Sequence, residues 1–568
     1  MYINNISIYL NILFFFLQTI LFPNFTLANS KLILQRKQTN FSPQDQLSKM
    51  TLEEKIGQLF IIGFSQSSLD PSLQEHIRKY KFGSFIFFKR NFKGPLDIKK
   101  FNSDLNQLSI KTTGIMPLLA VDQEGGNVAR IETKPTIPHF FHFGDVNDSN
   151  LNLSLGEITG KLLSHYGFNL NLAPVLDLAD SKVDSFISLR SFGSDPAKVS
   201  SLGYFYSKGL LNYGVIPTAK HFPGLGSLDS DPHLKTVSSD INLTDLEKLD
   251  LKPFVEFTKL GPNSMVMLSH IIYPKVDNSR LPASFSKYIV QNLLREKIGF
   301  KGVILTDDLQ MKSSSSISTA PEASLKALQA GADMVMLSWS MSEQRKAFEK
   351  VKNSVELGIL SKEQLDEKVL RILSLKHFLA DKFNSSQKRS LASSDNSQLH
   401  FTDESSKELS FIQQFIFEKK LNGLFADKDL LSRSKLCLIS NNNFLISDFS
   451  KTKIKGFKSY NLPKGINLSV VKNFFSNNTC ETILVTLETL DEVYLFNSLK
   501  SFNGKNVVVI NHTIPSSLID RKKYYSVLDF YGLKTTGLKP LSSRFKELFH
   551  KPDNYTQNYP DKTKAQKL

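Results

Sequence analysis

The stretch 219–233 gathers many side chains that can exchange protons or bind polar ligands. It contains two histidines, two aspartates and one lysine, and it begins as the end of an apolar strand before Gly and Pro turn it into a loop. Loops held by a rigid scaffold are where catalytic residues concentrate. A connecting turn needs only turn-forming residues, so the composition favours a catalytic or binding role over a polar surface turn.

Asp231 and His233 in this stretch place a carboxylate and an imidazole two positions apart. A carboxylate that accepts one ring N–H fixes the histidine tautomer and stabilises the imidazolium, which leaves the other nitrogen for a substrate oxygen. An unperturbed histidine titrates near pH ~6.5, close to the working pH of a general acid. The simpler interpretation is a surface histidine in a turn.

Asp307 directly follows a second apolar run, and an ionised carboxylate at a strand end can face a bound ligand. The alternative is that Asp307 or its neighbour Asp308 only caps the following helix. We assign that cap to Asp308.

These candidates must be positioned by the elements around them, and short apolar runs alternate here with helical intervals. Continuous apolar strands alternating with helices indicate parallel strands covered on both faces. Eight such units in roughly 300 residues fit a (β/α)₈ TIM barrel, and a doubly wound open sheet is the alternative. The runs are 58–64, 82–88, 116–121, 168–178, 215–219, 264–269, 302–306 and 332–337.

Polar groups repeat at the same end of these runs, which supports the barrel because that fold places its active site at the C-terminal ends of the strands. Asp177 and His270 stand at two of these ends as weaker candidates. Trp339, the only tryptophan, follows the eighth run, where its ring could stack on a ligand or serve in packing. Thr51 and Glu54 have the spacing of a capping box in a helix expected over 42–59.

The sequence outside the predicted barrel suggests a targeting segment, a linker, a second domain and a tail. Residues 1–28 resemble a secretory signal peptide, although no Lys or Arg precedes the apolar run, so an uncleaved membrane anchor is the alternative. We expect the catalytic barrel over 42–383, a linker over 384–400, a small α/β domain over 401–550 and a mobile tail over 551–568. Strand-like runs at 435–440, 481–488 and 506–511 indicate the α/β domain.

Composition excludes some classes of protein. The formal net charge of +16 is spread along the chain without a long basic run, so nucleic acid is not an expected partner, while association with a membrane or the cell wall stays open. Cys437 and Cys480 are the only cysteines, which argues against a structural zinc site. They can form one disulfide or remain two buried thiols.

Four motifs together give the chain a resemblance to glycoside hydrolase family 3, and within it to the bacterial β-N-acetylglucosaminidases. The resemblance spans about residues 42–385, and each motif follows a predicted barrel strand. The motifs are DQEGG at 122–126 with Arg130, RSFG at 190–193, the loop 220–233, and TDDLQM at 306–311.

The resemblance implies a role for each candidate residue. It makes Asp307 the nucleophile of a retaining mechanism and His233 the acid/base that Asp231 orients. The expected contacts to substrate come from Asp122, Arg130, Arg190, Lys220 and His221. For Arg130 and Arg190, salt bridges at the barrel rim are an equal alternative.

Three positions depart from the family pattern: Asn127 replaces an arginine, Leu225 a histidine and Pro232 a serine. Pro232 removes a hydroxyl and a backbone N–H beside the proposed dyad, so the geometry of the dyad depends on how the stiffened loop folds.

We therefore expect an exported, monomeric exo-β-N-acetylglucosaminidase that acts on peptidoglycan- or chitin-derived glycans without metal or cofactor. A β-glucosidase or xylosidase of the same family is the first alternative, and it is disfavoured because those enzymes lack the Asp-x-His loop. A glycoside phosphorylase and a non-catalytic sugar-binding envelope protein are the others.

Overall fold

The structure is a computed structural model that describes residues 42–179, 186–225 and 237–392 and shorter pieces between 405 and 529. The predicted signal peptide at 1–28 and the predicted tail at 551–568 lie outside the described residues. Within the described part, no helix is both long enough and apolar enough to cross a membrane.

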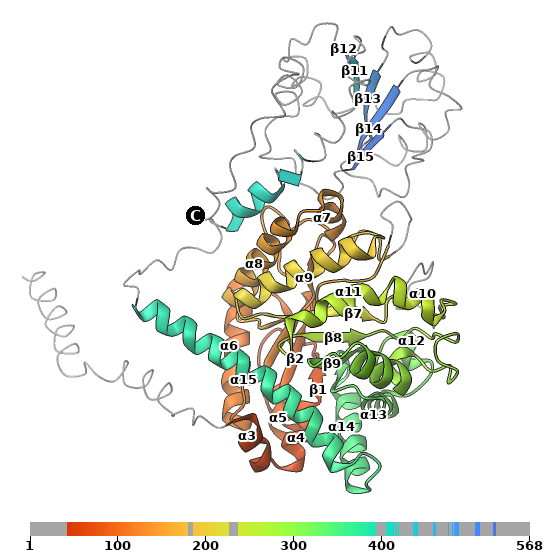
Figure 1. Cartoon of the computed structure of the whole chain (residues 1–568). Helices are drawn as coiled ribbons and strands as arrows, with labels where there is room; N and C mark the ends of the chain where they lie inside the picture. Colours follow the sequence, from red (N-terminus) through yellow and green to blue (C-terminus); the bar gives the residue numbers. More distant parts are fainter. Residues whose placement is uncertain are drawn as a thin grey trace, which may run out of the picture. The chain divides into compact units, whose positions relative to one another are not determined.

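Eight parallel strands close into a barrel, in the order β1-β10-β9-β8-β7-β6-β3-β2 (Figure 1). Each strand overlaps one of the eight predicted apolar runs, so the (β/α)₈ prediction is confirmed and the open-sheet alternative is wrong. The strands are β1 (Phe60–Ile62), β2 (Ser84–Phe87), β3 (Leu118–Val121), β6 (Leu170–Asn171), β7 (Ile216–Phe222), β8 (Met265–Leu268), β9 (Val303–Asp308) and β10 (Met334–Leu337).

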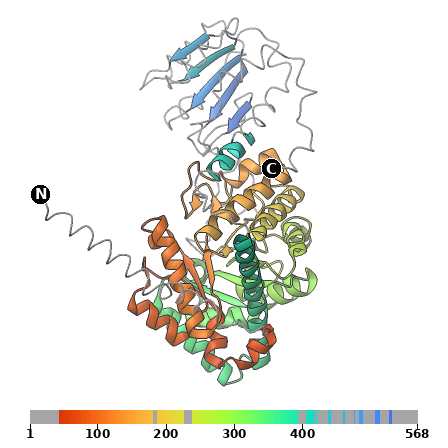
Figure 2. The same cartoon turned by 90° about the vertical axis from the view of Figure 1, so that its left-hand side faces the viewer.

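Helical segments follow each strand and cover the outside of the barrel, with α8 and α9 packed side by side (Figures 1 and 2). They are α5 (Pro71–Tyr80), α6 (Pro95–Thr113), α8 (Ser149–His165), α9 (Pro196–Asn212), α11 (Leu251–Phe257), the π-helical segment Tyr288–Lys297, α13 (Ala320–Ala330) and α14 (Met341–Glu356). Shorter helices in the connections are α7 (Phe140–Val146), α10 (Leu243–Lys248) and α12 (Lys312–Ser315).

Burial of the barrel strands explains their apolar sequences. Every strand residue of the barrel is buried except Asp307, which is partly exposed near the end of β9. Strands covered on both faces lose the alternation of apolar and polar residues and become continuous apolar runs. A partly exposed carboxylate in such a strand is an exception, which indicates a role other than packing.

The predicted capping box at the start of the barrel is confirmed, whereas the single helix expected over 42–59 is two. Glu54 accepts the backbone N–H of Thr51 at 2.9 Å, and the Thr51 hydroxyl accepts the N–H of Glu54 at 3.2 Å. Met50 is extended and separates α3 (Pro43–Lys49) from α4 (Leu52–Gln58). The break arises because Thr51 begins a new helix with its own N-cap.

A second sheet follows the barrel in sequence, with five parallel strands in the order β12-β11-β13-β14-β15 (Figure 2). The three predicted strands are present as β11 (Leu436–Ser440), β13 (Thr482–Leu487) and β14 (Asn506–Asn511). The two that were not predicted, β12 (Lys458–Asn461) and β15 (Ser526–Asp529), are short and form the two edges, where an apolar run is not required.

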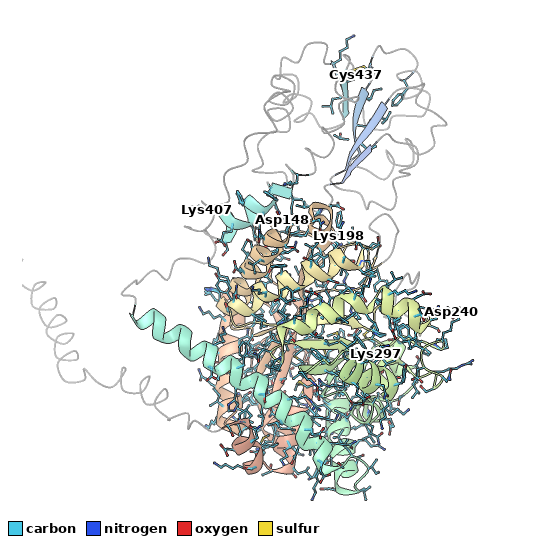
Figure 3. All side chains as sticks on the ribbon, viewed as in Figure 1. Asp148, Lys198, Asp240, Lys297, Lys407 and Cys437 are labelled. Carbon is cyan, nitrogen blue, oxygen red and sulfur yellow. A yellow bond between two sulfur atoms is a disulfide. The ribbon has the colours of Figure 1, made fainter. Side chains whose placement is uncertain are left out.

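A disulfide joins Cys437 on β11 to Cys480 just before β13, with their Cα atoms 5.9 Å apart (Figure 3 labels Cys437). This resolves the choice between a disulfide and two thiols that the sequence left open. It ties together two neighbouring strands of the second sheet, which pair directly through Cys437 and Ile483.

The linker predicted at 384–400 is helical in its first part. The closing helix α15 runs from Lys362 to Ala392, and residues 393–404 lie outside the described part of the chain. Extending an existing helix costs far less than nucleating one, so the Ser and Asn residues that suggested a linker do not end it.

Candidate active site

The C-terminal ends of the barrel strands β3, β7 and β9 bring several predicted site residues to one end of the barrel. Asp122 directly follows β3, and Asp307 lies near the end of β9. Lys220 and His221 belong to β7, which continues to Phe222 and is buried throughout. The expectation that both residues lie in a loop is therefore wrong. Carboxylates that follow β3 neutralise Lys220, and one that follows β6 bonds to His221, so the strand can carry both residues inside.

Five charged side chains form what we call the rim ion cluster: Asp122, Glu124, Arg130, Arg190 and Lys220. The Lys220 Nζ lies 3.0 Å from Asp122 Oδ1 and 2.8 Å from Glu124 Oε1. The Arg130 Nη2 lies 3.1 Å from Asp122 Oδ2. Arg190 forms a two-pronged pair with Glu124, with Nε and Nη2 at 2.8 and 2.7 Å from its two carboxylate oxygens. The cluster joins two acids and three bases around one buried lysine.

The cluster keeps its members charged despite their burial. Burial alone would raise the pKa of Asp122, but the charges of Lys220 and Arg130 overcome it and hold that pKa below its usual value. The same competition, with Arg190 and Lys220 as partners, lowers the pKa of Glu124 strongly. Burial opposes the charge of Lys220, and the two carboxylates still raise its pKa. A preorganised set of ionised donors and acceptors of this kind suits the hydroxyl groups of a sugar.

One member of the cluster has a donor without a partner. The Arg130 Nε is buried and makes no hydrogen bond among the described residues. Buried polar groups are normally paired, so this unpaired donor has two explanations. Either the salt bridge to Asp122 holds the guanidinium where its Nε has no acceptor, or a bound ligand accepts the Nε–H. The salt bridge that the sequence left as one alternative for Arg130 is present, and its contact with a ligand stays a prediction.

Asp177 organises the end of β7 from the segment that follows the neighbouring strand β6. Its carboxylate lies 2.7 Å from the His221 Nδ1, accepts the His221 backbone N–H, and accepts the Leu225 N–H at 2.9 Å. A hydrogen bond at Nδ1 leaves Nε2 as the ring nitrogen available to a ligand. Leu225, which stands where the family has a histidine, is thus held through its backbone.

A pocket at this end of the barrel contains both His221 and Asp307. His270 also borders it, with Nδ1 2.8 Å from the Ser284 hydroxyl and Nε2 3.2 Å from the Asp308 carbonyl. Among the described residues, no three His, Cys, Asp or Glu side chains gather closely enough to bind a metal ion. The pocket is lined by Phe186, His221, Leu225, Ser269, His270, Asp307 and Met311.

The adjacent carboxylates of Asp307 and Asp308 occupy different environments. Asp307 borders the pocket, and its Oδ1 accepts the N–H of Asp308 at 2.8 Å. The Asp308 Oδ1 accepts the N–H of Gln310, two residues along the chain, and the N–H of Ser338, just beyond the neighbouring strand β10, while its Oδ2 accepts the Ser338 hydroxyl. Asp308 therefore closes a turn and links β9 to the residue after β10. The helix cap assigned to it from the sequence is wrong, because Asp308 belongs to β9 and the following helix α12 begins only at Lys312.

The environment of Asp308 makes stability depend on pH. Burial, with the Asp307 charge as a smaller cause, raises its pKa to about 6, although hydrogen bonds from Ser338 and Gln310 oppose the shift. Between pH ~4 and ~6, Asp308 is protonated in the folded state and ionised in the unfolded state. The free energy of unfolding therefore decreases as pH rises through that window. Integrated over the window, the loss is about 3 kcal/mol.

We expect Asp308→Asn to remove this pH dependence, because the amide oxygen can accept the same two N–H groups and its NH₂ can donate to Ser338. Urea unfolding at pH 4, 5, 6 and 7 measures it. The free energy of unfolding of the natural protein should fall relative to that of the variant as pH rises from 4 to 6, and then run parallel to it. A constant difference across all four values would show that Asp308 is ionised throughout.

The predicted proton-transfer pair falls outside the described residues. Asp231, His233 and the intervening Pro232 lie in the segment 226–236, which begins directly after Leu225. Their roles stay predictions. Lys220 and His221 of the same stretch lie in the described part of the chain. Lys220 belongs to the rim ion cluster, and His221 pairs with Asp177.

Glu124 was not among the site residues predicted from the sequence, and Asp177 and His270 were only weaker candidates. Glu124 stands two residues after Asp122, and residues two apart in an extended segment point to the same side, so the spacing contained this signal. Asp177 lies one strand away from His221 in the barrel but 44 positions away in sequence, and no local pattern indicates that pairing.

Comparison with known proteins agrees with the fold and the strand-end motifs. A β-hexosaminidase of Nitrosomonas eutropha is 35% identical over 262 residues, which cover 45% of this chain and 73% of that relative. The solved structure of a β-N-acetylhexosaminidase from Beutenbergia cavernae is 27% identical and covers 58% of this chain and 99% of its own, with a TM-score of 0.53.

The barrel and the second domain together also have a counterpart. A glycoside hydrolase family 3 β-N-acetylglucosaminidase from Paenibacillus shares the fold over 88% of this chain and 96% of its own, with a TM-score of 0.66 and 24% identity. The model of the glycosyl hydrolase family 3 N-terminal domain matches residues 51–375, more than half of the chain. With its closed barrel and charged strand ends, the chain belongs to glycosyl hydrolase family 3.

Proposed function

We propose that the chain is a retaining exo-β-N-acetylhexosaminidase that releases terminal N-acetylglucosamine from peptidoglycan- or chitin-derived glycans. The observation that carries the proposal is Asp307, a partly exposed carboxylate in an otherwise buried strand, which borders a pocket with His221. Relatives that share the barrel are named β-hexosaminidases, which supports the choice of sugar.

The proposed reaction proceeds in two steps. Asp307 attacks the anomeric carbon while His233, oriented by Asp231, protonates the departing glycosidic oxygen, which gives a covalent glycosyl-enzyme. His233 then removes a proton from a water that attacks the same carbon and frees Asp307. Asp122, Lys220, His221, Arg130 and Arg190 hold the hydroxyl and acetamido groups of the terminal sugar in this proposal.

We also propose that the protein is exported. The apolar segment at 1–28 supports this, and so does the Cys437–Cys480 disulfide, because disulfides persist mainly in oxidising compartments. The basic net charge suits anionic wall fragments as substrates, and association with the cell wall or a membrane is part of the same proposal.

The function is tested with purified protein lacking residues 1–28, natural and with His233→Ala. We expect the natural protein to release nitrophenol from the aryl β-N-acetylglucosaminide but not from the glucoside, and to give β-N-acetylglucosamine as the first product by NMR. His233→Ala should lose about 10²–10⁴-fold on the disaccharide and far less on the activated aryl glycoside, which needs little protonation.

Each other outcome selects an alternative. Equal losses on both substrates would mean that His233 positions substrate instead of moving a proton. An α-configured first product would replace the retaining mechanism by an inverting one. Faster turnover in phosphate with a glycosyl phosphate product would indicate a phosphorylase, and no turnover of any aryl glycoside would favour a sugar-binding protein.

A further inference from the structure

An aromatic and guanidinium cluster stands at the strand ends, outside the residues used above. The guanidinium carbon of Arg90 lies 4.3 Å from the centre of the Phe88 ring and 4.1 Å from that of Trp339. The two rings face each other, with centroids 6.2 Å apart and planes 25° apart. We call Phe88, Arg90 and Trp339 the rim platform.

The rim platform is fixed to four adjacent strands of the barrel. The Arg90 Nε donates to the Phe64 carbonyl at 3.0 Å, beyond the end of β1, and its Nη2 donates to the Ser338 carbonyl at 2.6 Å, beyond β10. Gln310, which follows β9, accepts the backbone N–H of Trp339 at 2.8 Å. Phe88 itself follows β2. A tryptophan held in this way needs little ordering when a ligand binds.

The rim platform also connects to both sides of the candidate active site. On one side, Ser338 precedes Trp339 and bonds to Asp308, the neighbour of Asp307. On the other side, the Arg130 guanidinium lies 5.9 Å from the Phe88 ring while its Nη2 pairs with Asp122. The platform therefore spans the arc of strand ends between the proposed nucleophile and the rim ion cluster.

Exposure separates the rim platform from the pocket. Trp339 is 63% exposed, whereas Lys220 and His221 are 3% and 5% exposed. The terminal sugar is assigned to those deeper polar groups, so the platform is left for a group that lies farther out. Indole faces bind the C–H faces of sugar rings, and the Arg90 guanidinium has N–H groups beyond the two donated to carbonyls.

We propose that Trp339 and Arg90 bind the leaving-group sugar, the residue on the other side of the glycosidic bond from the terminal N-acetylglucosamine. This rests on the proposed function and extends it: Trp339 makes the enzyme prefer a saccharide over a small leaving group. Trp339 is a specificity residue and takes no part in bond cleavage.

Trp339 reports on its own occupancy because it is the only tryptophan of the chain. Protein carrying Asp307→Asn is titrated with the β-linked disaccharide of N-acetylglucosamine and with N-acetylglucosamine alone, by tryptophan fluorescence and by calorimetry in parallel. We expect the disaccharide to change the fluorescence with the calorimetric Kd, and the monosaccharide to bind with little change. Disaccharide binding without a fluorescence change would overturn the inference alone, and no binding of either sugar would overturn the proposed function with it.

Kinetics supply an independent measurement. Trp339→Ala and Trp339→Phe are compared with the natural protein on the disaccharide and on N-acetylglucosaminyl fluoride, whose leaving group is a single atom. We expect kcat/KM of the alanine variant to fall about tenfold more on the disaccharide than on the fluoride, mainly through KM, and Phe to recover most of it. Equal losses on both substrates would assign Trp339 to packing, whereas fluoride hydrolysis by the natural protein keeps the proposed function intact.

Discussion

Replacing Asp307 by Asn is expected to lower kcat for the aryl β-N-acetylglucosaminide by about 10⁴-fold or more. The amide cannot form the glycosyl ester, and removing the nucleophile of a hydrolase that works through a covalent intermediate has effects of about that size. Asp307 is the partly exposed residue of the buried barrel strands and borders the pocket, so the change should leave the fold intact. Steady-state release of nitrophenol measures the loss, and the thermal unfolding midpoint checks the fold.

Asp308→Asn is the matched control, because it makes the same chemical change one residue along the chain. Its carboxylate bonds to Ser338 and Gln310 and does not border the pocket, so this variant should keep activity within about tenfold of the natural protein. If Asp308→Asn were the inactive variant and Asp307→Asn the active one, the assignment of the nucleophile would be reversed. If both variants had comparable activity, neither aspartate would be the nucleophile.

Glu124→Gln is expected to destabilise the fold by about 3–5 kcal/mol, the range for breaking a buried ion pair by removing one partner. The Glu124 side chain is 2% exposed and pairs with Arg190 and Lys220. A neutral amide would leave the Arg190 guanidinium buried without its two-pronged partner. The free energy of unfolding in urea, measured at pH 7, gives the change directly.

Asp122→Asn separates stability from binding in the same cluster. Lys220 keeps its pair with Glu124, and the Asp122 side chain is 14% exposed, so we expect a stability loss below about 2 kcal/mol. In contrast, kcat/KM should fall about 10²-fold or more, because charged hydrogen bonds to two sugar hydroxyls contribute about 1.5–3 kcal/mol each. A larger stability loss for Asp122→Asn than for Glu124→Gln would exchange the two roles.

The barrel was accessible from the sequence because its signal is local. Strands covered on both faces must be apolar along their whole length, and runs such as 302–306 and 332–337 therefore mark β9 and β10 without knowledge of their neighbours. The edge strand Lys458–Asn461 of the second sheet shows the opposite case. It is polar and short, because only one side of an edge strand pairs with the sheet.

The candidate site was accessible in part. Because parallel strands of a barrel end at one face, Asp122, Lys220 and Asp307 were expected together, and each occupies a strand end or the residue beyond it. The bonds between them were not accessible. Asp122 and Lys220 are 98 positions apart, and only closure of the barrel brings the lysine between two carboxylates.

The stretch 219–233 shows which features of the site the sequence determines and which ones only the tertiary structure determines. Its residue types by themselves determined that titratable groups gather after the fifth barrel strand, and the order of the motifs pointed to glycoside chemistry. Tertiary structure decided that Lys220 and His221 lie inside the strand, and that Asp308 turns to Ser338 while Asp307 borders the pocket. The reason is physical: strand formation follows from local apolar content, whereas the state of a buried charge depends on partners that only the closed fold supplies.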